Sequence, residues 1–209
     1  MKQNKYSIQV LYYSSCLICF MLTTHFREAS TLWREKPGKY AKKNSAAYQF
    51  FNTKLQPEIE KIVRHLGYKA LIVDAEVGNG SWSKTPYIAI RHNGVAPSFM
   101  EGVSVAYLFA PDFGRLYITI IQGVKRTRST ELDKSKKKLE KTIDRPEGFN
   151  EGPIPQLVRD EKPNSSSAKY RKGIIYSKEY ILEKLPDDEE FTNDLKKTLK
   201  IYQDYAESQ

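Results

Sequence analysis

Hydrophobic positions between residues 69 and 121 fall into short runs that are typical of β-strands. The runs cover residues 69–77, 86–91, 103–110 and 116–121, and each is rich in β-branched and aromatic side chains. The short gaps between them favour antiparallel pairing over parallel crossovers. A later run at residues 173–180 predicts one more strand. The pattern therefore predicts a twisted, mainly antiparallel sheet.

Apolar residues before and after these runs follow helical spacing instead. Asn44 is a candidate helix cap, Pro57 a good first-turn residue for a second helix, and Gly67 a stop signal. Near the C-terminus, acidic Asp187 and Asp188 suit the start of a helix. Its apolar stripe comprises Phe191, Leu195, Leu199 and Tyr202. Helices that flank an antiparallel sheet place the fold in the α+β class.

Three other stretches complete the organisation of the chain. Residues 1–43 form a basic N-terminal extension, and residues 44–209 form the domain. Residues 125–145 are highly charged, so one face of a helix there must stay in solvent or meet phosphate. Residues 146–169 are rich in Pro, Gly and Ser and predict a long loop. The sequence Asp112-Phe113-Gly114 predicts a tight hairpin turn between the third and fourth strands.

The charge favours a polyanionic partner. A net charge of +9 and a pI near 9.3 suit nucleic acid or an anionic membrane surface, although the charge also fits a basic protein that is merely kept soluble. Cys16 and Cys19 are the only cysteines, so we expect no disulfide framework, no zinc site and a reducing, cytoplasmic compartment. The apolar run at residues 12–22 is interrupted and too short to span a bilayer. We expect no membrane association and no cofactor.

Enzyme signatures are sparse. The Gly78-Asn79-Gly80 turn lacks the lysine of a phosphate-binding loop, and no nucleophile elbow is present. A metal-dependent nuclease remains an alternative, because Asp112 and the Asp160-Glu161-Lys162 group are the residue types that hold Mg²⁺ and a water. A protein-interaction module with incidental charge is the second alternative. The sequence favours a non-catalytic protein.

An ordered set of short motifs lies within residues 77–123. It comprises Gly78-Asn79-Gly80, Ser81-Trp82, Pro86-Tyr87, the run from Gly102 to Phe109, and Asp112-Phe113, followed much later by Tyr170-Arg171-Lys172-Gly173. In this order, the motifs resemble the DNA-binding domain at the N-terminus of the McrB family, over about residues 55–205. The resemblance implies a module that binds DNA around methylated cytosine and flips that base into an aromatic pocket. It also implies a restriction (antiviral defence) system in which a GTPase motor and a nuclease act as partners, so the chain is either a fragment or a stand-alone reader of double-stranded DNA.

The resemblance assigns a pocket and a loop, and the positive charges add candidate phosphate contacts if they share a face; otherwise these charges form an ordinary solvated surface. The pocket for the modified base comprises Tyr87, Ser104, Leu108 and Tyr170. The DNA-binding loop comprises Asn79, Gly80, Ser81 and Trp82. The expected phosphate contacts are Lys84, Arg91, Lys125, Arg126, Arg128 and Arg171.

Two of these positions depart from the family pattern. Ser104 stands where the family has an aromatic wall, and Asn79 stands where the family has a residue that fills the gap left by the flipped base. A serine cannot stack on a base, and asparagine is a poor wedge. Three alternatives follow: a neighbouring Tyr107, Phe99 or Trp82 substitutes, another base is flipped, or none is flipped.

Overall fold

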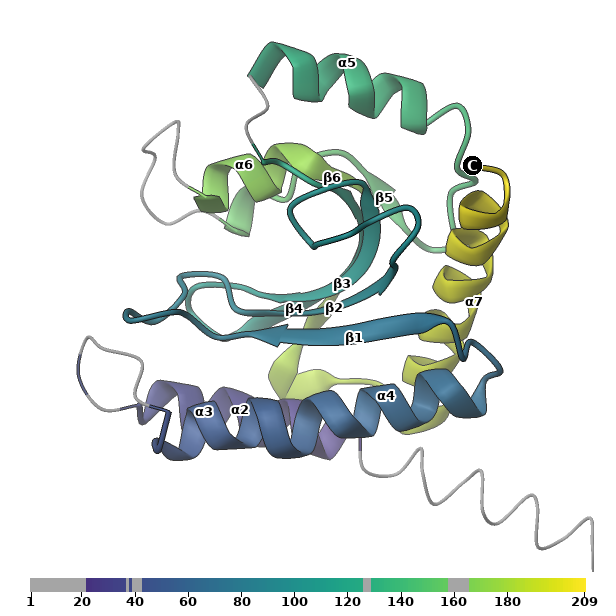
Figure 1. The fold of residues 1–209 in the computed structure, drawn as a ribbon. Coiled ribbons are helices and arrows are strands. Elements are labelled where there is room, and N and C mark those ends of the chain that lie inside the picture. Colours follow the sequence, from purple (N-terminus) through teal and green to yellow (C-terminus); the bar gives the residue numbers. More distant parts are fainter. Residues whose placement is uncertain (1–21, 37, 39–42, 126–128, 158–165) are drawn as a thin grey trace, which may run out of the picture.

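A six-stranded antiparallel sheet forms the centre of the protein (Figure 1). The structure is a computed structural model that describes residues 22–36, 38, 43–125, 129–157 and 166–209. The strand order is β1-β2-β3-β4-β6-β5, and every neighbouring pair is antiparallel. The predicted α+β class and antiparallel sheet are confirmed. The strands are β1 (Leu71–Glu76), β2 (Tyr87–His92), β3 (Val103–Phe109), β4 (Arg115–Gln122), β5 (Asn150–Glu151) and β6 (Ile174–Ile181).

The five predicted strands lie within two residues of those observed, and the hairpin turn joins β3 to β4 as expected. The short β5 was not predicted, because its two residues carry no alternating pattern and become a strand only by pairing with Ser177 and Tyr176 of β6. It lies inside the segment predicted as a long loop. A second part of that segment is also regular: helix α6 (Ser166–Gly173) carries Tyr170, which we had expected on a loop.

Four helical segments and α7 (Asp188–Glu207) cover one face of the sheet (Figure 1). Three of the segments run without a break as α3 (Ala46–Phe50), the π-helical η1 (Phe51–Leu55) and α4 (Gln56–His65), where we had expected two separate helices. Pro57 does not interrupt this helix, because the wider π-turn lies directly before it, where a proline ring needs room. Ser45, rather than Asn44, caps the helix by accepting a hydrogen bond from the Tyr48 N–H.

The fourth segment, α2 (Leu22–Arg34), lies inside the stretch that the sequence assigned to an N-terminal extension. Phe26 is completely buried, and Trp33 stacks on Phe113 of the β3–β4 turn with ring centroids 4.7 Å apart. Phe113 has a φ of 54°, and its carbonyl accepts hydrogen bonds from Ser30 and Arg34. Helix α2 is therefore part of the main core of the domain.

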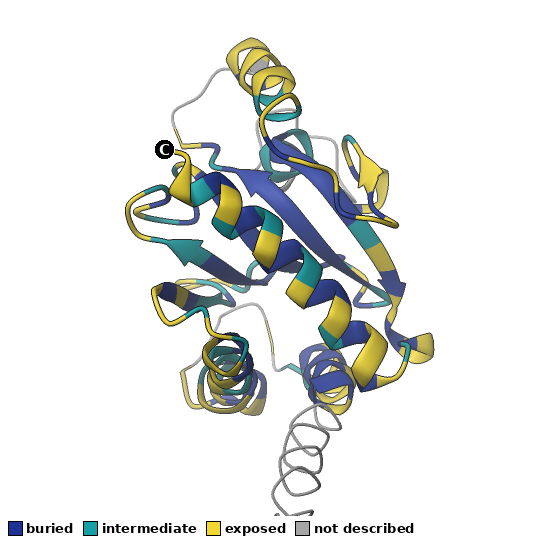
Figure 2. Cartoon of the chain, turned by 90° about the vertical axis from the view of Figure 1, so that its right-hand side faces the viewer, coloured by how far each residue is buried: buried dark blue, intermediate teal, exposed yellow. Residues whose placement is uncertain are grey.

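The main core lies between these helices and the sheet. Figure 2 shows α7 with its buried residues toward the sheet and its exposed residues outward, in agreement with the predicted stripe from Phe191 to Tyr202. The Asp187 side chain caps α7 by accepting from the Glu190 N–H at 2.8 Å. Within the described part of the chain, no helix is long and apolar enough to cross a membrane.

The opposite face of the sheet is covered by smaller pieces. These are the β2–β3 connection (residues 93–102), α5 (Ser129–Leu139), the 3-10 turn η2 (Pro155–Leu157) and α6. Under them lies a smaller core, which includes Phe99, Leu108 and Ile154. A further 3-10 turn, η3 (Leu182–Lys184), joins β6 to α7. This second face carries the candidate site.

Candidate functional site

A cleft of about 550 Å³ opens on the second face, between the loop of residues 77–86, the β2–β3 connection and α6. The first two of these segments flank β2, whereas α6 is more than 60 residues further along the chain. Six of the residues assigned from the resemblance line it: Asn79, Ser81, Trp82, Lys84, Tyr87 and Tyr170. Glu76, Gly78, Ser83 and Met100 complete the lining.

The 77–86 loop has a conformation that depends on glycine. Gly78 has a φ of +122°, and a Cβ on it would lie 2.0 Å from the Ser81 carbonyl oxygen. The Ser83 N–H closes the turn by donating to the Val77 carbonyl at 2.9 Å. Asn79, Gly80 and Ser81 are exposed at the tip. The loop is therefore a tight, preformed projection beside the cleft.

Trp82 connects this loop to the main core. Its ring meets that of Trp33 edge to face at a centroid distance of 5.0 Å, and it is half-buried. The Trp82 indole N–H is buried and has no hydrogen-bond partner among the described residues. This contact fixes the base of the loop and leaves its tip exposed.

Two tyrosine rings form one wall of the site, and the buried ring of Phe99 packs against both. Tyr87 stacks on Phe99 at a centroid distance of 3.9 Å and an interplanar angle of 29°. Tyr170 meets Tyr87 edge to face at 6.2 Å and lies 5.4 Å from Phe99. The Tyr170 hydroxyl donates to the Met100 sulfur at 3.3 Å. Burial, followed by neighbouring negative charge, raises the pKa of both tyrosines above the ordinary value, so both phenols keep their protons at physiological pH.

The other two predicted pocket residues lie beneath the surface. Leu108 is fully buried next to Tyr87 in the strand register, and Ser104 lies further along the same face of β3. Neither lines the cleft. Of the three aromatic substitutes for Ser104, Tyr107 lies on the opposite face against Phe26, whereas Phe99 and Trp82 are at the site.

The predicted phosphate contacts have different surroundings. Lys84 is exposed on the cleft rim, Lys125 forms an ion pair with Glu101 at 3.0 Å, and Arg171 is half-buried beside Tyr170. Arg126 and Arg128 lie outside the described residues.

The side chain of Arg91 is only 12% exposed, because its Nε donates to the Asp74 carboxylate at 2.6 Å and its Nη1 donates to the Ala96 carbonyl at 3.1 Å. Its guanidinium group holds the β2–β3 connection in place.

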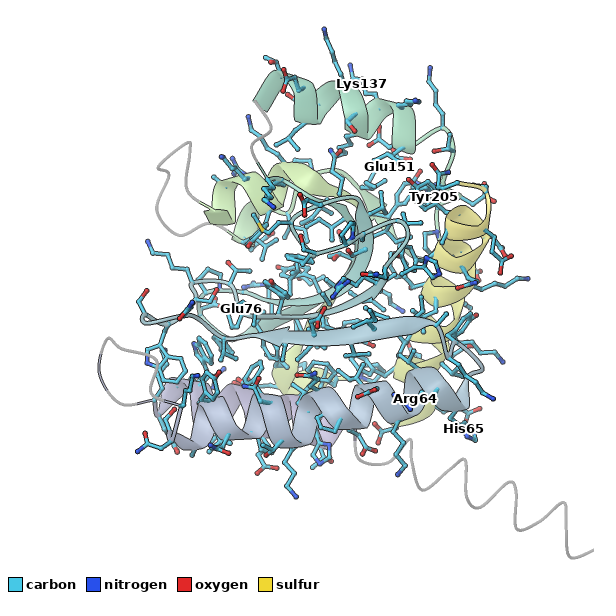
Figure 3. The ribbon with its side chains drawn as sticks, in the orientation of Figure 1. Arg64, His65, Glu76, Lys137, Glu151 and Tyr205 are labelled. Atoms are coloured by element: carbon cyan, nitrogen blue, oxygen red, sulfur yellow. The ribbon has the colours of Figure 1, made fainter. Side chains whose placement is uncertain are left out.

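Helix α5 adds cations that the sequence analysis did not assign to the site. The helix packs against α6, and its exposed lysines are Lys134, Lys137 and Lys138. Figure 3 shows Lys137 on this helix, on the far side from the sheet. The charged stretch of residues 125–145 was the available signal, but only the packing of α5 on α6 places this helix on the cleft face of the sheet.

The residues of the nuclease alternative do not form a metal site among the described residues. Asp112 is at the exposed tip of the β3–β4 turn, where it accepts from the Gly114 N–H and lies 3.7 Å from Arg115. Asp160, Glu161 and Lys162 lie outside the described residues. Within the described part, no group of three His, Cys, Asp or Glu side chains could hold a metal ion.

Comparisons with known proteins identify one family. The family model described as "MrcB-like, N-terminal domain" matches residues 30–207, a span that begins inside α2 and ends at the last residue of α7. No curated protein matches the chain.

Proposed function

Because the chain belongs to the family of MrcB-like N-terminal domains, we propose that it is a DNA-binding specificity module. In this proposal it recognises double-stranded DNA that carries a modified base, methylated cytosine in the first instance, for a restriction system. The observation that carries the proposal is the cleft itself, because it joins the predicted DNA-binding loop to Tyr87 and Tyr170.

The aromatic wall provides what an extruded base needs. Removing a base from the duplex costs a few kcal/mol of stacking, which a protein offsets by holding the base against flat or apolar side chains. Tyr87 and Tyr170 present such surfaces to the cleft, with ring centroids 6.2 Å apart. A cleft of about 550 Å³ is also within the range of pockets that enclose small ligands. In this proposal the two tyrosines, rather than Ser104, hold the base, and Phe99 supports them from beneath.

The 77–86 loop would approach the duplex beside the extruded base. Its tip, with Asn79 and Ser81, is exposed, while Trp82 holds its base against Trp33. A rigid projection loses little conformational entropy on binding. Asn79 enters the space left by the base in this arrangement, and its amide replaces base-pair hydrogen bonds rather than stacking.

Cations on the cleft face are the candidates for contacts with the DNA backbone. Lys84 lines the cleft, Lys125 and Arg171 adjoin its residues Met100 and Tyr170, and the α5 lysines lie on the helix that packs against α6. Phosphate contacts position a protein on DNA without reading its sequence. We assign this role to these cations and leave Arg91 to hold the connection that carries Phe99.

The module is non-catalytic in this proposal. Cleavage and GTP hydrolysis belong to other domains or subunits, and recognition of the modified base belongs to this domain. An interaction module with incidental charge differs in one measurable respect, because it does not bind DNA with a steep salt dependence.

The test is a binding panel of duplexes that are identical except for one cytosine, which is methylated, hydroxymethylated or unmodified. Affinities are measured at one fixed salt concentration, and the methylated duplex is then titrated over a range of salt. We expect tighter binding to a modified duplex, and fluorescence enhancement of 2-aminopurine placed next to the modified cytosine, where extrusion of that base unstacks its neighbour. Equal affinity for all three duplexes, with no fluorescence change, would contradict the proposal.

A further inference from the structure

A row of side chains crosses five strands on the cleft face of the sheet. The strand register pairs Glu76 with Tyr87, Tyr87 with Leu108, Leu108 with Tyr117, and Tyr117 with Glu179. Residues paired in this way point to the same side of a sheet. The row therefore has a carboxylate at each end, and only the Glu76 end lies in the cleft.

Glu76 is held in a defined position there. One carboxylate oxygen, Oε1, accepts a hydrogen bond of 2.6 Å from the Gly78 N–H at the start of the loop. Figure 3 places Glu76 at the end of the sheet next to the 77–86 loop. Burial first, and then the Glu76 charge among others, raises the pKa of Tyr87 and Tyr170. The carboxylate is thus close enough to both phenols to influence them electrostatically.

The three groups differ in hydrogen-bonding character. A carboxylate only accepts, whereas a protonated phenol can donate. The Tyr170 hydroxyl donates to the Met100 sulfur, which is a weak acceptor that a ring nitrogen would replace. The cleft therefore presents an acceptor beside two potential donors.

Among bases, this arrangement matches an exocyclic amino group beside a ring nitrogen, as in cytosine and adenine. Thymine has no amino group and places a carbonyl oxygen where that of cytosine would be, and a carbonyl oxygen facing a carboxylate is repelled. Guanine has a carbonyl oxygen at the corresponding position of its ring and carries its amino group at C2 instead. Side chains of Asp and Glu accept hydrogen bonds from the cytosine amino group in DNA readers.

We propose that Glu76 is a specificity-determining residue that accepts a hydrogen bond from the exocyclic amino group of the extruded base, while the Tyr87 or Tyr170 hydroxyl donates to the adjacent ring nitrogen. This inference rests on the proposed function, because it requires a base in the cleft. It extends that function by naming the chemical feature that is read, an amino group rather than a methyl group alone.

The test compares 5-methylcytosine with thymine, which differ only in the amino group and the associated ring proton. Each base is placed opposite an abasic site, so that base pairing contributes equally little to the cost of extrusion. The full chain binds both duplexes and a matched duplex with plain cytosine. We expect the 5-methylcytosine duplex to bind at least about tenfold more tightly than the thymine duplex.

The variant Glu76→Gln keeps an oxygen for the Gly78 N–H and replaces the other acceptor by an amide donor. We expect it to reduce the preference for 5-methylcytosine over thymine to about twofold or less. The matched control is Glu179→Gln at the other end of the row. The Glu179 carboxylate accepts from the Tyr117 hydroxyl at 2.8 Å and lies outside the cleft, so this variant should keep the wild-type preference.

The outcomes separate the two proposals. If the wild-type protein binds all duplexes equally, the proposed function fails. If it binds the modified duplex preferentially but treats 5-methylcytosine and thymine alike, only the role of Glu76 is overturned, whatever the variants do. The same conclusion follows if Glu76→Gln folds normally and keeps the full wild-type preference.

Discussion

Two stacked aromatic pairs, one on each face of the sheet, differ in what surrounds them. Tyr107 and Phe191 stack in the main core at a centroid distance of 5.6 Å, and neither has any solvent exposure. Tyr87 and Phe99 stack at 3.9 Å at the edge of the smaller core, where Tyr87 also lines the cleft. The first pair is enclosed by helices α2 and α7, whereas the second borders an open surface.

This difference indicates how the domain divides its aromatic residues between stability and binding. On the helix-covered face, large side chains are removed from water and contribute the hydrophobic stabilisation of the fold. On the cleft face, small residues such as Ala89 and Ala106 lie in the middle of the sheet, and two tyrosines, Tyr87 and Tyr170, border the cleft. A ring at the rim contributes less to folding and remains available to a ligand.

Phe191→Ala should produce the largest effect. Truncating a fully buried Phe leaves a cavity, and we expect the free energy of unfolding to fall by about 3–5 kcal/mol. Urea denaturation followed by circular dichroism measures this loss. The folded fraction should bind modified DNA with wild-type affinity, and a loss of binding without a loss of stability would contradict the division between the two faces.

Tyr87→Ala and Tyr170→Ala should instead weaken DNA binding more than they lower the stability of the fold. We expect each to weaken binding to a methylated duplex by about 1–3 kcal/mol, because a stacking partner of the base is removed, with a smaller effect on plain duplex. The control is Tyr68→Ala, since Tyr68 is half-exposed next to the main core and far from the cleft in the fold. Equal loss on methylated and plain duplexes would refute the assignment of the pocket.

Replacing Lys134, Lys137 and Lys138 by Gln should change salt dependence rather than preference. Each lost phosphate contact should reduce the slope of log K against log salt concentration by about 0.9. A control with the same change in charge replaces Lys54, Lys61 and Lys196. These lysines are exposed on η1, α4 and α7, which cover the other face of the sheet. An equal reduction in both triple variants would show that total charge, rather than the α5 surface, determines binding.

The smallest expected effect is that of pH. Here the two faces of the sheet should behave alike, because both contain tyrosines whose pKa is raised by burial. Burial raises the pKa of Tyr107 on one face and of Tyr87 and Tyr170 on the other. Their contribution to stability is fully present below the unfolded pKa of about 10 and is lost only as pH rises through the higher folded values. We therefore expect the affinity for DNA, measured at fixed salt, to stay constant between pH 7 and pH 9, and a change that Tyr87→Phe or Tyr170→Phe abolishes would contradict this.

Much of the fold was predictable because its signals are local. Alternation and β-branched residues predicted the strands, helical spacing predicted the buried stripe of α7, and the ordered motifs from Gly78 to Phe109 indicated the family. Each signal depends on residues within a few positions of one another. For the same reason, the sequence determined that Tyr87 begins a strand and that Asn79 is at a loop tip.

The composition of the cleft was decided by tertiary structure. Phe99 reaches Tyr87 only because the β2–β3 connection folds over the sheet, and Tyr170 reaches both because α6 packs there. Glu76 faces Tyr87 only through the strand register, which a shift of one residue would reverse. Contacts between residues more than ten positions apart depend on how the whole chain packs, and no local spacing in the sequence reports them.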